Sequence, residues 1–90
     1  MTFTTKPQIM YQGEHKKLVY DLYALGGQYK IYHKHKILNE NTYYYIWEIV
    51  AAFCTFGEAW DMYSHIKDIP VERDFDEWFE MLERKLNKDA

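Results

Sequence analysis

The chain has 90 residues, of which 48% are hydrophobic and 19% aromatic, and its formal net charge is −3. This length indicates one small domain, and the hydrophobic content excludes a largely disordered chain. The single cysteine, Cys54, excludes an intramolecular disulfide and favours a reducing compartment. No apolar run has the length of a signal peptide or a membrane span, so we expect a cytoplasmic protein.

Charge is divided unevenly along the chain. Residues 1–38 contain six lysines and two acidic residues, a net charge of +4, whereas residues 39–90 contain five basic and twelve acidic residues, a net charge of −7. A basic first part and an acidic second part indicate two different surfaces, unless the two parts pair with each other as a solvated exterior.

An arm and a short helix are the first predicted elements. Residues 1–13 lack periodicity and contain Pro7 and Gly13, which is typical of an extended arm. In residues 14–25 the apolar side chains recur at spacings that place them on one side of a helix. The Gly26-Gly27 pair is a natural stop for this helix.

Residues 28–53 are predicted to form an antiparallel hairpin. Residues 28–38 alternate with period two, which is typical of a strand. One face would carry Tyr29, Ile31, His33, His35 and Ile37, and the other Lys30, Tyr32, Lys34 and Lys36. Residues 39–41 are turn formers, and residues 42–53 are rich in β-branched and aromatic side chains. The second strand would place Tyr43, Tyr45, Trp47 and Ile49 on one face.

Two helices are predicted to follow the hairpin. Thr55 and Glu58 have the spacing of a capping box, in which each side chain bonds a backbone amide near the other residue. This helix would run to about Lys67 before Pro70, with one apolar stripe: Phe56, Ala59, Trp60, Tyr63 and Ile66. A second cap at Asp74 and Glu77 would start a final helix, whose apolar face contains Phe75, Trp78, Phe79, Leu82 and Leu86.

This order of elements predicts a single α+β domain spanning residues 1–90. Helices would pack on one face of a small antiparallel sheet. Because two strands alone are only marginally stable, we expect a third strand from residues 1–12 or from a partner chain.

No pattern of catalytic residues is present. Cys54 has no catalytic signature around it, and there is no glycine-rich phosphate loop or nucleophile elbow. We therefore expect a non-enzymatic protein without a cofactor. His33 and His35 share a strand face, as pairs of metal ligands do, but no further ligand lies at a recognisable spacing. We predict no metal site and interpret both histidines as half-buried.

The predicted hairpin combines lysines with aromatic rings, which suits single-stranded nucleic acid. Tyr43, Tyr45 and Trp47 would stack bases, and three lysines would hold phosphates: Lys30, Lys34 and Lys36. A two-layer fold buries one face of its sheet, so only one aromatic row can remain open. The net negative charge argues against general nucleic-acid binding.

The segment FCTFGEAWDMYSHI, residues 53–66, followed by Pro70, resembles the first-helix signature of the translation initiation factor 4E family, which binds the mRNA 5′ cap. Six residues match without a gap: Thr55, Trp60, Tyr63, Ser64, His65 and Ile66. The resemblance covers about residues 25–75, the N-terminal half of the family. It implies that Tyr43 stacks on the cap guanine. The second stacking tryptophan of the family has no clear counterpart, and the resemblance does not extend to the half that holds the cap phosphates.

The resemblance also implies that the first helix receives a partner peptide at Trp60, beside Phe56. Two functions therefore stay open. The first is an RNA- or nucleotide-binding domain that resembles a reduced cap-binding fold. The second is a small viral or phage module that inhibits or recruits a host protein through its tryptophan-bearing, acidic surface. A homodimer that completes the sheet is a third, simpler possibility, and we expect no contact with a membrane.

Overall fold

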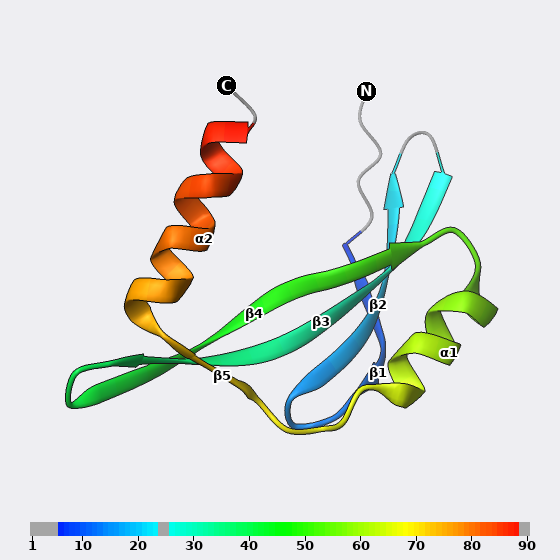
Figure 1. Ribbon diagram of the computed structural model, residues 1–90. Helices are drawn as coiled ribbons and strands as arrows, with labels where there is room; N and C mark the ends of the chain where they lie inside the picture. The colour runs from blue at the N-terminus through cyan, green and yellow to red at the C-terminus, as the bar shows by residue number, and fades with distance from the viewer. Residues whose placement is uncertain (1–5, 24–25, 89–90) are drawn as a thin grey trace.

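The computed structural model describes residues 6–23 and 26–88 (Figure 1). Within these ranges the elements are, in chain order, β1 (Gln8–Gln12), β2 (Lys16–Tyr23), β3 (Gly26–Asn39), β4 (Thr42–Phe53), α1 (Phe56–His65), β5 (Val71–Asp74) and α2 (Phe75–Lys88). Strands β1 to β4 form an antiparallel meander, and β5 pairs in parallel with β3. The two helices lie toward opposite ends of the sheet (Figure 1). The predicted α+β class and hairpin are confirmed. Of the two sources expected for a third strand, the N-terminal segment provides it as β1, and residues 1–5 of the predicted arm lie outside the described residues.

The helix predicted over residues 14–25 is wrong, because this segment contains β2. Strand β2 pairs with β1 on one edge and with β3 on the other, so the sheet satisfies its backbone hydrogen bonds. Leu18 and Val19 are both buried although they point to opposite faces. A strand that buries side chains on both faces lacks a clean alternation, and its apolar spacing then resembles that of a helix. The end of the predicted helix, residues 24–25, lies outside the described residues.

Strand β3 is the longest strand and organises the sheet. One of its edges pairs with β4 from Tyr29 to Asn39. Its other edge pairs with β2 up to His33 and then with β5 from His35 onward. Strand β5 therefore extends the sheet where β2 ends. No pattern in the sequence predicted this four-residue strand.

A β-bulge at Val50 exchanges the two faces of β4. Tyr32 of β3 pairs with Ile49, but the preceding residue, Ile31, pairs with Ala51. Before the bulge, odd-numbered residues of β4 face away from the helices. After the bulge, Ala51 and Phe53 point toward α1 and pack on its core. One strand thus supplies side chains to an open face and to the core.

The core lies between α1 and the sheet. It consists of Leu18, Ile31, Ala59 and Tyr63, all buried. This arrangement confirms the amphipathic stripe predicted for the first helix, which spans Phe56–His65. Neither described helix has the length and apolar character needed to cross a membrane.

The predicted capping box does not form. Thr55 occupies the N-cap position of α1 in an extended conformation, but its side chain bonds no backbone amide there. Its hydroxyl instead donates to Glu58 Oε1 at 2.7 Å. This hydroxyl-to-carboxylate bond is charge-assisted, and it engages the Glu58 carboxylate that a capping box would place on the Thr55 amide. At α2 the predicted cap residue does act: Asp74 Oδ2 accepts from the Asp76 amide at 3.3 Å.

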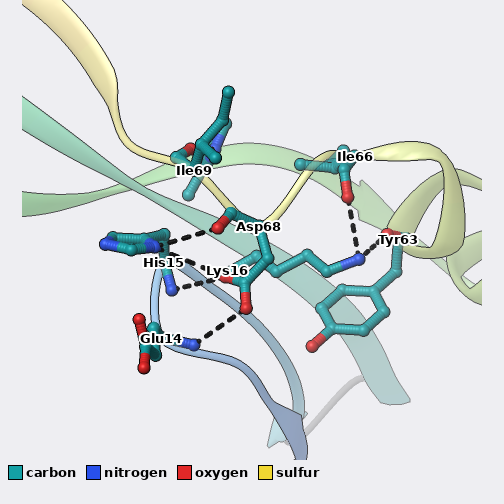
Figure 2. A network of polar contacts seen from close by, with 8 residues as sticks. Glu14, His15, Lys16, Tyr63, Ile66, Asp68 and Ile69 are labelled. Atoms are coloured by element: carbon teal, nitrogen blue, oxygen red, sulfur yellow. Dashed lines mark hydrogen bonds and ion pairs between the residues drawn. The ribbon is translucent and has the colours of Figure 1, made fainter.

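Lys16, at the start of β2, forms hydrogen bonds with the C-terminal end of α1 (Figure 2). Its Nζ donates to the carbonyl oxygens of Tyr63 and Ile66, both at 2.8 Å. The last carbonyls of a helix have no partner within it and carry partial negative charge. The Ile66 amide already donates to the carbonyl oxygens of Met62 and Tyr63, both at 3.2 Å, and the lysine adds a charged donor to this C-terminal cap.

Asp68, in the connection between α1 and β5, forms hydrogen bonds with the turn before β2 (Figure 2). Its carboxylate accepts hydrogen bonds from the backbone amides of His15 at 2.6 Å and Glu14 at 3.1 Å. The bond from the His15 amide is the main cause that lowers the pKa of Asp68. The carboxylate also packs on Gly13, where a Cβ atom would lie 2.6 Å from Asp68 Oδ2.

Helix α2 contacts the sheet through a hydrogen bond to Glu48 of β4. The indole Nε1 of Trp78 donates to Glu48 Oε1 at 2.8 Å. The other carboxylate oxygen lies 3.4 Å from Nδ1 of buried His35, without hydrogen-bond geometry. Burial lowers the pKa of His35; Glu48 opposes this effect, while Arg73 and His33 reinforce it. Burial of His35 against Glu48 and α2 therefore favours its neutral imidazole.

Candidate nucleic-acid interface

The sheet surface opposite the helices carries lysines and aromatic rings from three strands. We call it the open face and define it by Lys17, Tyr32, Lys34, Lys36, Tyr43, Tyr45 and Trp47. Because Lys34 pairs in register with Trp47, and Lys36 with Tyr45, side chains of β3 and β4 lie beside one another on this face. The face on which Tyr29, Ile31 and His35 lie is the one that the helices cover.

The lysines of the open face lie against its rings. Lys36 Nζ is 4.3 Å from the ring centroid of Tyr43, and Lys34 Nζ is 5.3 Å from that of Tyr45 and 5.0 Å from that of Trp47. These distances are within the range of cation–π contacts. Tyr43 and Tyr45 remain 54% and 47% exposed and meet edge to face at 5.7 Å. Cations and accessible rings are therefore in place together.

Lys17 lies in this site, although the sequence patterns did not predict it there. Its Nζ lies 4.5 Å from the ring centroid of Trp47 and 5.0 Å from that of Tyr32. It reaches them from β2, the segment predicted as a helix. The available signal was the alternation of Lys17, Val19 and Asp21, which point to one face of β2.

Lys30 shares the face with the other predicted lysines, but its charge is compensated within the protein. Its Nζ forms an ion pair with Asp21 Oδ2 at 3.0 Å, and both side chains are mostly buried. The structure therefore groups Lys34 and Lys36 with the rings and assigns Lys30 to an internal ion pair. One acidic residue also joins the face, since Glu72 of β5 pairs in register with Lys36.

The predicted partner-binding residues, Phe56 and Trp60, lie together on the helical side of the sheet. Their rings stack at 6.1 Å, and the Trp60 ring is 4.7 Å from that of Tyr11 in β1. Trp60 is 40% exposed. The two predicted sites therefore occupy opposite surfaces of the molecule.

The histidines of β3 serve the packing of neighbouring segments. His33 Nε2 lies 2.7 Å from the carbonyl oxygen of Ile69, in the connection before β5. The rings of His33 and His35 are 5.9 Å apart. Over residues 6–23 and 26–88, no three or more His, Cys, Asp or Glu side chains are placed to hold a metal ion.

Comparisons of the chain with protein-family models, with curated proteins and with solved structures give no match. The resemblance to the initiation factor 4E family therefore stays a prediction, and the site has to be interpreted from its own geometry.

Proposed function

We propose that this protein binds single-stranded RNA on the open face, without catalysing a reaction. The observation that carries the proposal is that Lys17, Lys34 and Lys36 lie against aromatic rings on the sheet face that the described helices leave open. Of these rings, Tyr43 and Tyr45 are exposed and Trp47 is half-buried. Sheets of this kind stack unpaired bases on aromatic side chains and hold phosphates with cations, and each stacked base contributes about 1–3 kcal/mol.

The lysines that lie on the rings can make room for a stacked base, because their side chains are flexible. An ammonium group and a base cannot occupy the same face of a ring at once. The four-carbon stem of lysine lets the ammonium move from the ring to a neighbouring phosphate as a base stacks. The rings of Tyr43 and Tyr45 are inclined at 77° to each other. They would therefore take splayed bases of a single strand, not the parallel stack of a duplex.

A narrower form of the proposal is a reduced cap-binding fold that acts in translation, in the cytoplasm. It rests on the resemblance at residues 53–66 and on Tyr43, which is exposed as a stacking residue has to be. A cap analogue should then compete with RNA, and Tyr43→Ala should abolish that competition.

The test is a titration of short labelled single-stranded RNA, followed by fluorescence anisotropy. Trp47→Ala should weaken binding by roughly 5- to 150-fold, the equivalent of about 1–3 kcal/mol. Trp60→Ala is the matched control, because it removes a tryptophan from the opposite surface. Raising the salt concentration should weaken the wild-type complex, since phosphate contacts release counterions. Absence of binding at about 10–100 µM RNA, or equal losses in the two variants, would refute the proposal.

A second candidate function is the recognition of a host protein by the surface around Trp60. A partly exposed tryptophan among other rings is typical of an interaction hot spot. In pull-downs from host lysate, Trp60→Ala should lose a partner that Trp47→Ala retains. Loss of the same partner in both variants would argue against this site. Light scattering on the purified protein would show whether that partner is a second copy of the chain.

A further inference from the structure

A hollow of about 390 Å³ opens on the β1 side of the open face. It is lined by Lys6, Pro7, Ile9, Lys17, Val19 and Tyr32. The strand register explains its position, since Ile9 pairs with Val19, and Lys17 pairs with Tyr32. Its volume is in the range of small-molecule sites.

Lys17 lies between this hollow and the aromatic rings of β4. It lines the hollow, and its Nζ also lies 4.5 Å from the centroid of Trp47. A strand whose bases stack on the rings of β4 would therefore reach the hollow without leaving the open face.

The lining of the hollow selects a particular chemical group. Two of its side chains are cationic, Lys6 and Lys17, and none of the six is a carboxylate. The nearest acidic side chain on this face of β2 is Asp21, two residues after Val19, and its charge is compensated by the ion pair with Lys30. The remaining surface is aliphatic, apart from the ring of Tyr32. Such a site suits a group that combines a dianion with a flat ring.

A terminal nucleotide has this chemistry. A phosphomonoester carries about −1.5 to −2 charges at neutral pH, whereas a phosphodiester within a strand carries one. We propose that the hollow binds the phosphorylated end of a single RNA strand, with the phosphate between Lys6 and Lys17 and the base against Tyr32. This inference rests on the proposed function of the open face. A free nucleoside monophosphate offers the same groups.

The experiment compares three labelled oligonucleotides of one sequence: with a 5′-phosphate, with a 3′-phosphate, and with hydroxyls at both ends. One phosphorylated form should bind about five- to tenfold more tightly than the hydroxyl form, as expected for an added charge-assisted contact at a solvated site. Lys6→Gln should remove this preference, and Lys67→Gln should keep it. Competition by a nucleoside monophosphate at similar concentrations would assign the site to free nucleotides instead and overturn the strand-end proposal.

A second variant fills the hollow without altering charge. Ile9→Trp adds a large ring at a residue that is 54% exposed, so folding should be preserved, and the preference for a terminal phosphate should vanish. Ile69→Trp is its control at a residue 58% exposed on another segment. Equal binding of all three oligonucleotides by wild type, or a preference that survives both Lys6→Gln and Ile9→Trp, would overturn this inference alone. Failure of every oligonucleotide to bind would overturn the proposed function as well.

Discussion

Lys16 and Tyr63, 47 residues apart, meet in two ways: the lysine Nζ donates to the tyrosine carbonyl oxygen at 2.8 Å and lies 4.3 Å from the centroid of its ring. The same ammonium caps the carbonyl of Ile66. The part-buried ammonium of Lys16 thus links β2, which the sequence patterns wrongly predict as a helix, to α1, which they predict correctly.

Lys16→Met should lower the free energy of unfolding by about 2–3 kcal/mol, because two carbonyl groups lose a charged donor. Urea denaturation followed by circular dichroism measures the change. Lys67→Met is the control, since it removes an exposed lysine from the neighbouring connection. Similar losses in both variants would show that charge, and not the cap, is responsible.

Asp68→Asn should flatten the dependence of stability on acid pH. Hydrogen bonds from the His15 and Glu14 amides lower the pKa of Asp68 below its ordinary value of 3.8. The native state therefore favours the ionised carboxylate. Its contribution to stability is present above pH 3.8 and is lost as the pH falls through the lowered pKa of the folded protein.

Urea titrations of wild type and Asp68→Asn at neutral pH and near pH 3 provide the measurement. Wild type should lose more stability between the two conditions than the variant does. Asp61→Asn, a change at an exposed position of α1, serves as the control. If the wild-type and Asp68→Asn curves stay parallel across this range, the amide contacts are not the source of the effect.

Trp78→Phe should destabilise the packing of α2 by about 1–3 kcal/mol. The change removes the indole donor that bonds Glu48 and leaves a partly buried carboxylate without it. Phe79→Leu, at a neighbouring exposed residue of the same helix, should change stability by less than about 0.5 kcal/mol. Urea denaturation of both variants decides the matter, and equal effects would contradict a specific role for the Trp78 bond.

Glu40→Asn should stabilise the hairpin by roughly 0.5–1 kcal/mol. Glu40 has a φ angle of 55°, which is costly for most residues with a Cβ atom and less so for asparagine. Glu40→Ala removes the same charge but keeps the backbone cost, so it should show no such gain. Thermal unfolding of the three proteins compares them directly, and a gain shared by both variants would point to charge.

The aromatic rings on the open face of β4 were predictable because β3 and β4 alternate cleanly up to Trp47, and both described helices cover the same side of this hairpin. Lys17 was not predictable in the same way, since β2 buries Leu18 on one face and Val19 on the other. Burial on two faces erases the period-two pattern on which strand assignment depends.

Non-local pairing explains the other differences. Strand β5 has four residues and forms only because β3 extends beyond the end of β2. Its local sequence carries no signal of that vacant edge. The cap at Thr55 was correct in position but not in its bonds, because the hydroxyl donates to the Glu58 carboxylate and its oxygen accepts from no backbone amide of the helix. Residue spacing alone does not distinguish these two arrangements, since both need Thr55 and Glu58 three residues apart.

The bulge at Val50 has a consequence for how this sequence can change. Residues 43, 45 and 47 lie on the open face, while Ala51 and Phe53 of the same strand pack beneath α1. Substitutions in the first group leave the side chains that contact the core beneath α1 in place. Under the proposed function, binding and folding would thereby depend on different parts of a single strand, and each could vary independently of the other.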